Sequence, residues 1–135
     1  MSDANQEPTL NEYMDTVAAY AKAKGWWRDG RSVGDDIALM HSELSEALEE
    51  HRNCRRANEL YFVNGFIGEE RSERPTADLS WTPDWKPEGV PAELADVIIR
   101  ILHFCAEHEV DITDAMAAKL EYNETRPARH GGKAL

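Results

Sequence analysis

One apolar segment that begins with acidic residues constrains this chain most. The sequence "PAELADVIIRILHF", residues 91–104, is apolar nearly all the way round a helix. It therefore predicts a helix over about 91–108 at the centre of a helical bundle. Glu93 and Asp96 stand in the first turns of this segment. Because burying an unpaired carboxylate is costly, we expect a cation to be held beside them.

A second helix, predicted from about residue 33 or 36 to residue 53, carries acidic residues beside its apolar stripe. Glu43 and Glu46 are three residues apart and share a helix face, and Glu50 follows one turn later. Two such pairs facing each other would supply four oxygen ligands, the set that Mg²⁺ or Mn²⁺ prefers. A single Glu-x-x-Glu is commonly only a solvated face, so the prediction depends on the pair at 93 and 96. A carboxylate di-iron site is disfavoured because no histidine follows a glutamate by three residues.

The rest of the chain predicts two more helices and an arm. A first helix over 10–24 begins with a capping box of Thr9 and Glu12 and ends at Gly25. Residues 54–90 break the helical pattern, contain an Asn64-Gly65 turn signal, and predict an irregular arm or a small hairpin. A fourth helix is capped by Asp111 or Thr113 and terminated by Pro127. We expect one all-α domain over 1–135, with flexible ends at 1–8 and 127–135.

Charge and composition exclude several classes of partner. The formal net charge is −11, which argues against binding a nucleic acid polymer or an anionic membrane through a basic patch. The N-terminal residues lack a signal peptide pattern, and no apolar run reaches the roughly 20 residues that span a bilayer. We therefore expect a cytoplasmic protein. Cys54 and Cys105 form no metal or redox motif, and each is interpreted as a small buried hydrophobe.

The last predicted helix and its tail carry a group of basic residues, in contrast to the acidic pairs of the two preceding helices. Its basic face combines two cations, an amide and an aromatic ring at i, i+3, i+4 and i+7, and consists of Lys119, Tyr122, Asn123 and Arg126. His130 and Lys133 add donors beside two glycines. Basic residues that answer the helix dipole would explain part of this pattern. A Mg²⁺-bound polyphosphate would satisfy both the acidic pairs and the basic face.

These motifs together resemble a known enzyme family. They are Glu43-x-x-Glu46, Glu93-x-x-Asp96, Lys119-x-x-Tyr122-Asn123-x-x-Arg126 and the tail "RHGGK". The chain from Leu10 to Lys133 resembles the MazG-like all-α nucleoside triphosphate pyrophosphohydrolases. The resemblance implies a four-helix fold completed by homodimerisation, sometimes as a dimer of dimers. It also implies Mg²⁺-dependent, house-cleaning hydrolysis of a nucleoside triphosphate to a monophosphate and pyrophosphate. Ser42 replaces an acidic residue of the family motif, and the arm before Glu93 is unusually long.

The resemblance also implies roles for individual residues. The metal ligands would be Glu43, Glu46, Glu93 and Asp96, and the substrate contacts would be Lys119, Tyr122, Asn123 and Arg126. Glu46 would accept the proton of the attacking water, with Glu50 as the alternative base. Trp26 and Trp27 precede the acidic helix, and Trp26 either stacks on the nucleotide base or packs in the core or a dimer interface.

Three alternatives stay open at the level of sequence. Phosphoribosyl-ATP pyrophosphohydrolase uses similar acidic helices. A helical dimer that binds Mg²⁺-nucleotide without cleaving it would keep the same ligands. A purely structural dimer is the third, although carboxylates at the edge of the core count against it. No short motif encodes the preferred base or sugar, which depend on the shape of the pocket.

Overall fold

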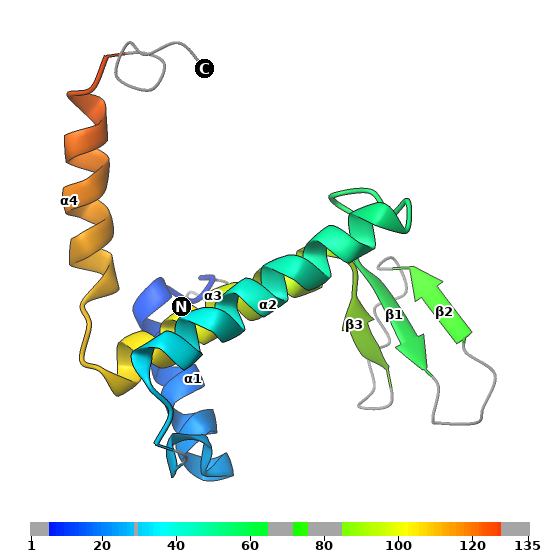
Figure 1. Cartoon of the computed structure of the whole chain (residues 1–135), viewed down its shortest axis with the longest axis horizontal. Coiled ribbons are helices and arrows are strands. Elements are labelled where there is room, and N and C mark those ends of the chain that lie inside the picture. The colour runs from blue at the N-terminus through cyan, green and yellow to red at the C-terminus, as the bar shows by residue number, and fades with distance from the viewer. Residues whose placement is uncertain (1–5, 29, 65–71, 76–84, 128–135) are drawn as a thin grey trace, which may run out of the picture. The chain divides into compact units, whose positions relative to one another are not determined.

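The computed structural model describes residues 6–28, 30–64, 72–75 and 85–127, and confirms that the chain is mostly helical (Figure 1). The elements are α1 (Leu10–Lys24), the 3₁₀ helix η1 (Trp26–Arg28), α2 (Val33–Arg52), β1 (Tyr61–Asn64), β2 (Ser72–Pro75), β3 (Lys86–Glu88), α3 (Val90–Glu107) and α4 (Ile112–Glu124). They form two compact units, Met1–Arg28 with Leu102–Leu135, and Asp29–Ile101. Helix α3 contributes residues to both units.

Helix α1 has the boundaries and caps that the sequence predicts. The Thr9 backbone N–H donates to the Glu12 carboxylate at 2.7 Å, and the Glu12 N–H donates to the Thr9 hydroxyl at 3.3 Å. At the other end Gly25 adopts φ 69°, the left-handed conformation that closes a helix and favours glycine. Local sequence is therefore sufficient to determine this helix.

Helix α2 begins at one of its two predicted starting residues, and helix α4 begins at one of its two predicted caps. The Ser32 hydroxyl accepts from the Asp35 N–H at 3.1 Å, so α2 starts at Val33, the earlier of the two possibilities. The Asp111 carboxylate accepts from the Asp114 N–H at 2.9 Å and starts α4 at Ile112. Helix α4 ends at Glu124, slightly before the proline that was expected to terminate it.

In the unit of residues 29–101, α2 and the first turns of α3 lie side by side (Figure 1). Strand β3 leads into α3 through Gly89, whose φ is 106°. A Cβ at this position would lie 2.2 Å from the Glu59 carbonyl oxygen. Only glycine therefore allows the backbone of the arm to pass this closely before α3 begins.

The predicted arm forms a small antiparallel sheet in the order β2-β1-β3. The register pairs Asn64 with Ser72, so β1 and β2 are joined by residues 65–71. The two-residue turn predicted from Asn64-Gly65 is therefore wrong, because a loop of that length cannot bridge this register. The third strand was also missed: Tyr61 pairs with Glu88 across β1 and β3 and is only 5% exposed.

In the other unit, α1 and η1 contact the last turns of α3. The Trp27 ring stacks on His103 with a centroid distance of 6.0 Å, and the Thr113 hydroxyl donates to the Asn11 side chain at 3.1 Å. Cys105 is buried here as expected, and burial raises the pKa of its thiol. The same expectation is wrong for Cys54, which is exposed after the end of α2 with φ 63°.

Candidate metal centre

Carboxylates from α2 and α3 converge within the unit of residues 29–101. Glu43, Glu93 and Asp96 each offer an oxygen within 4.8 Å of the others. Glu43 and Glu93 are both 7% exposed, whereas Asp96 is exposed. Oxygens this close can surround one divalent cation at the usual ligand distances of about 2.0–2.6 Å. The two acidic pairs that the sequence places on different helices thus contribute to one cluster, which we call the carboxylate cluster.

The secondary structure explains why these side chains meet. Glu93 and Asp96 are three residues apart at the start of α3 and share one face of the helix. The helix dipole favours negative charge in this first turn. Glu43 is presented by the middle of α2, one turn before the buried Ala47. A rigid helix therefore supports each ligand.

The raised pKa of Glu93 indicates that this carboxyl group has too little positive charge around it. Burial, followed by repulsion from Glu46 and Asp96, raises the pKa of Glu93 to about 7, and the opposing effect of Lys86 is smaller. A carboxyl group placed among other carboxylates is costly to ionise. A divalent cation would remove this cost, so the donor set fits Mg²⁺ or Mn²⁺.

The pKa of Asp96 is also raised, first by burial and then by repulsion from Glu43. Arg100 and Lys86 partly oppose this shift. The Arg100 Nε donates to the Glu43 Oε1 at 2.5 Å, which makes Arg100 a member of the cluster that sequence reasoning missed. Its spacing of four residues from Asp96, within an otherwise apolar segment, was the available signal.

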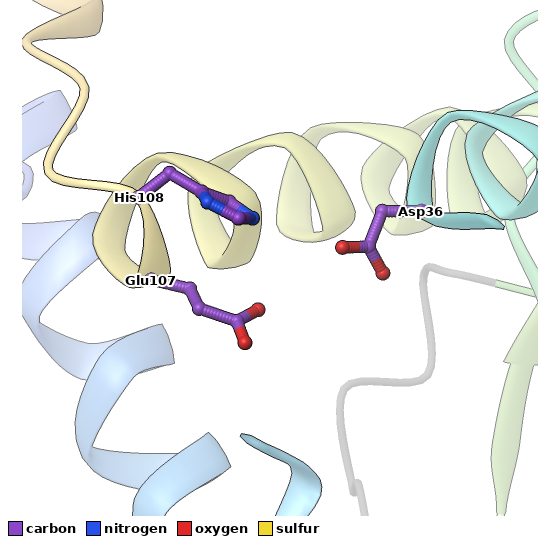
Figure 2. Close-up of side chains that lie close together, drawn as sticks. All are labelled: Asp36, Glu107 and His108. Atoms are coloured by element: carbon purple, nitrogen blue, oxygen red, sulfur yellow. The ribbon is translucent and has the colours of Figure 1, made fainter. Parts of the chain in front are cut away.

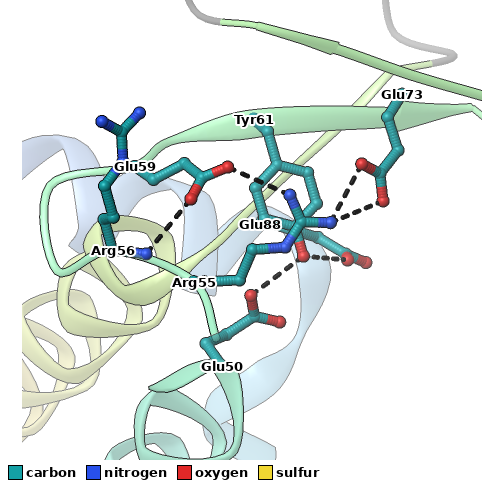
Figure 3. A network of polar contacts seen from close by, with 7 residues as sticks. All are labelled: Glu50, Arg55, Arg56, Glu59, Tyr61, Glu73 and Glu88. Carbon is teal, nitrogen blue, oxygen red and sulfur yellow. Dashed lines mark hydrogen bonds and ion pairs between the residues drawn. The ribbon is translucent and has the colours of Figure 1, made fainter. Parts of the chain in front are cut away.

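Glu46 and Glu50 take different places on α2. Glu46 is exposed and lies near enough to Glu93 to raise its pKa, although the converging oxygens belong to the other three predicted ligands. Glu50 accepts a hydrogen bond from the Tyr61 hydroxyl at 2.9 Å (Figure 3). Glu50 is therefore already engaged with the small sheet.

A polar network ties that sheet to the end of α2 (Figure 3). The Arg55 guanidinium donates to Glu59 at 3.1 Å and to both Glu73 oxygens at 2.8 and 2.9 Å. It also lies 3.9 Å from the centre of the Tyr61 ring. Burial, then the hydrogen bond to Glu50, raises the pKa of Tyr61 to about 12. We call this group the sheet network.

Lys119, Tyr122 and Asn123 of the predicted basic face lie on α4, whereas Arg126 lies two residues beyond the end of the helix at Glu124. The Lys119 Nζ lies 5.4 Å from the centre of the Tyr122 ring, and the Arg126 guanidinium lies 6.0 Å from it. Asn123 is on the same helix, where its carbonyl accepts from the Arg126 N–H at 3.2 Å. His130 and Lys133 lie outside the described residues. The roles of all six as substrate contacts stay predictions.

Trp26 contacts aromatic neighbours in the unit that contains α1. Its ring centre is 6.5 Å from that of Tyr20 and 6.4 Å from that of His103, and the residue is 46% exposed. Trp26 thus contacts aromatic neighbours within this unit but is not buried in its core. Its stacking on a nucleotide base stays a prediction.

A further group of titratable side chains is drawn in Figure 2. Glu107 and His108 are neighbours at the end of α3, where the His108 ring packs on Phe104 at 4.3 Å. Asp36, in the first turn of α2, belongs to the unit of residues 29–101 and forms an ion pair with Arg31 at 3.3 Å. We assign no site to these residues.

Comparisons with known proteins do not identify a family for this chain. No family model, no curated protein and no solved structure matches it. Within the described ranges, no helix has the length and apolar character needed to cross a membrane. The function is therefore argued from the carboxylate cluster.

Proposed function

We propose that this chain is a Mg²⁺-dependent nucleoside triphosphate pyrophosphohydrolase, which cleaves its substrate between the α and β phosphates. The convergence of Glu43, Glu93 and Asp96 is the observation that carries the proposal. The resemblance of the motifs to MazG-like enzymes and the basic face of α4 support the same chemistry. A cytoplasmic house-cleaning role, removing noncanonical or surplus nucleotides, is part of the proposal.

The residues of the chain divide the chemistry between them. Glu43, Glu93 and Asp96 would hold the cation, with Glu46 beside them. A bound magnesium ion supplies neutralisation of phosphate charge and a water of lowered pKa. A carboxylate oxygen of Glu46 would accept the proton of the water that attacks the phosphorus atom, while the bond between the α and β phosphates breaks and pyrophosphate leaves. We prefer Glu46 to Glu50 as this base because Glu50 already accepts a hydrogen bond from Tyr61.

Substrate binding is proposed for the basic face of α4. Lys119 and Arg126 would bind phosphate oxygens as cations, and Asn123 would bind the sugar or a phosphate through its amide. The Tyr122 ring centre lies 5.4 Å from the Lys119 Nζ and 6.0 Å from the Arg126 guanidinium. His130, Lys133 and Trp26 are proposed as further contacts.

A homodimer, or a dimer of such dimers, is the second part of the proposal. Apolar side chains on α2 and α3 that would normally be buried are 43–52% exposed: Ile37, Leu44, Leu48, Leu94, Ile98 and Ile99. Exposed apolar surface of this extent marks an interaction site. Sedimentation at micromolar concentration should give at least twice the monomer mass, and Ile98→Lys should shift the protein toward monomer. A monomeric wild type would contradict the proposal.

The enzymatic proposal is tested by pyrophosphate release from a panel of canonical and modified nucleoside triphosphates with Mg²⁺. The wild type should release pyrophosphate and a monophosphate, and Glu93→Gln should be slower by about a hundredfold or more. Glu49→Gln is the matched control, because Glu49 is 61% exposed and forms an ion pair with Arg52 outside the carboxylate cluster. A folded wild type that binds Mg²⁺ but cleaves no nucleotide would favour a nucleotide-binding module.

A further inference from the structure

Arg100 forms a hydrogen-bonded ion pair with Glu43, a predicted metal ligand. Its Nε donates to the Glu43 Oε1 at 2.5 Å, and the Glu43 side chain is only 9% exposed. Arg100 follows Asp96 by one helical turn, so it approaches the carboxylate cluster from the α3 side. The guanidinium therefore neutralises the carboxylate of a residue that a metal ion would use.

A divalent cation bound by Glu43 would lie next to this guanidinium. Two cations at such short range repel each other strongly unless an anion lies between them. The Arg100 side chain is 36% exposed and has solvent on one side, so it can turn away from Glu43 without leaving the site. An anion held between the metal ion and Arg100 would relieve the repulsion.

A phosphate group fits this position better than other anions of the cell. The planar guanidinium presents parallel N–H donors that match two phosphate oxygens, while a magnesium ion binds the remaining oxygens. Four carboxylates near one another would repel a polyphosphate without such a partner.

We propose that Arg100 exchanges partners: it holds Glu43 in the free protein and binds a phosphate oxygen of the substrate after a divalent cation has taken Glu43. The identity of the substrate as a polyphosphate rests on the proposed function, whereas the competition between Arg100 and the cation does not. If the ion pair only joined α2 to α3, replacing Arg100 should not tighten the binding of a metal ion.

The first test titrates Mn²⁺ alone into wild type and Arg100→Gln, with free Mn²⁺ measured by electron paramagnetic resonance. Removal of the competing hydrogen bond should tighten Mn²⁺ binding by about fivefold. Arg52→Gln is the matched control, since it removes the same charge from the exposed ion pair with Glu49 and should leave the affinity unchanged. Equal or weaker binding by Arg100→Gln, or no binding by the wild type, would overturn the proposal.

The second test measures the binding of inorganic pyrophosphate in saturating Mg²⁺ by calorimetry. Arg100→Gln should bind it about tenfold more weakly, because a charge-assisted contact to phosphate is lost. Unchanged pyrophosphate affinity would overturn the second half of the exchange. Both measurements are independent of turnover, so a protein that shows both shifts but cleaves no nucleotide would refute the proposed function alone.

Arg100→Lys keeps the proposal testable if the glutamine variant does not fold. Lysine retains the charge but lacks the Nε donor and the planar fork. We expect the same two shifts with smaller size, a modest gain in Mn²⁺ affinity and a loss of pyrophosphate affinity. Both affinities at the wild-type value would contradict an exchange that depends on guanidinium geometry.

Discussion

Two groups of acidic side chains on the same unit differ in what surrounds them. In the sheet network, backbone and side-chain hydrogen bonds from Arg56 and Arg55 lower the pKa of Glu59. In the carboxylate cluster, burial and like charges raise the pKa of Glu93 to about 7. Donors therefore satisfy the acids of the network, whereas Glu93 and Asp96 of the cluster have raised pKa values and still require positive charge. This contrast, and not the acidic pattern itself, separates a structural group from a candidate site.

The largest expected effect comes from breaking the sheet network at Tyr61. Tyr61→Ala should lower the free energy of unfolding by about 3–5 kcal/mol, because it removes a buried aromatic ring. Urea denaturation measures the loss. Tyr61→Phe, which removes only the hydroxyl bonded to Glu50, should cost about 1–2 kcal/mol. A loss below about 1 kcal/mol for the alanine variant would mean that the ring is not part of the core.

The second effect has the opposite sign and lies in the carboxylate cluster. The folded protein raises the pKa of Glu93 from 4.5 to about 7, so ionising this group opposes folding. Without divalent cations, wild-type stability should therefore fall relative to Glu93→Gln as pH rises from 4.5 to 7. The difference should be near zero at the acid end and reach up to about 3 kcal/mol above pH 7.

Urea denaturation of both proteins across this pH range measures that difference. Glu49→Gln, a variant of an exposed ion pair, should run parallel to the wild type. Parallel curves for wild type and Glu93→Gln would show that Glu93 ionises in the folded protein as freely as in the unfolded chain.

The third effect is stabilisation by Mg²⁺, which adds positive charge and so reverses the cost of ionising Glu93. Mg²⁺ at a hundred times its dissociation constant should stabilise the wild type by about 2.7 kcal/mol, and a chelator should remove the gain. Thermal unfolding with and without Mg²⁺ measures it. Asp96→Asn should lose most of this response, whereas Tyr61→Phe should retain it because the hydroxyl lies in the sheet network. Equal responses of Asp96→Asn and the wild type would place the ion elsewhere.

The smallest effect is expected for an acidic residue that lies outside both the sheet network and the carboxylate cluster. Glu49 and Arg52 form an ion pair at 3.5 Å with both side chains more than 60% exposed. Glu49→Gln should change the free energy of unfolding by less than about 0.5 kcal/mol. Chemical denaturation at low and high salt measures it. A change above about 1 kcal/mol would mean that exposed acids of α2 also contribute to the fold.

Much of the fold could be predicted because it depends on local signals. The caps act over three residues: Thr9 caps α1 as the sequence predicts, and Ser32 and Asp111 are each one of the two candidates that the sequence offers. The arm was predicted less well. Seven residues lie between Asn64 and Ser72, and β3 pairs with the other side of β1. Both features follow from pairing between distant residues, which a turn signal does not encode.

The candidate site divides in the same way. Sequence spacing alone determined that Glu43 and Glu46 share one helix face, that Glu93 and Asp96 share another, and that Lys119, Tyr122 and Asn123 share a third, because helix geometry is periodic. Tertiary structure decided that Glu43 pairs with Arg100 and that Glu50 pairs with Tyr61. Each partner lies on a different element from its glutamate, so packing brings the two together. The spacing of residues in the sequence does not specify these pairs.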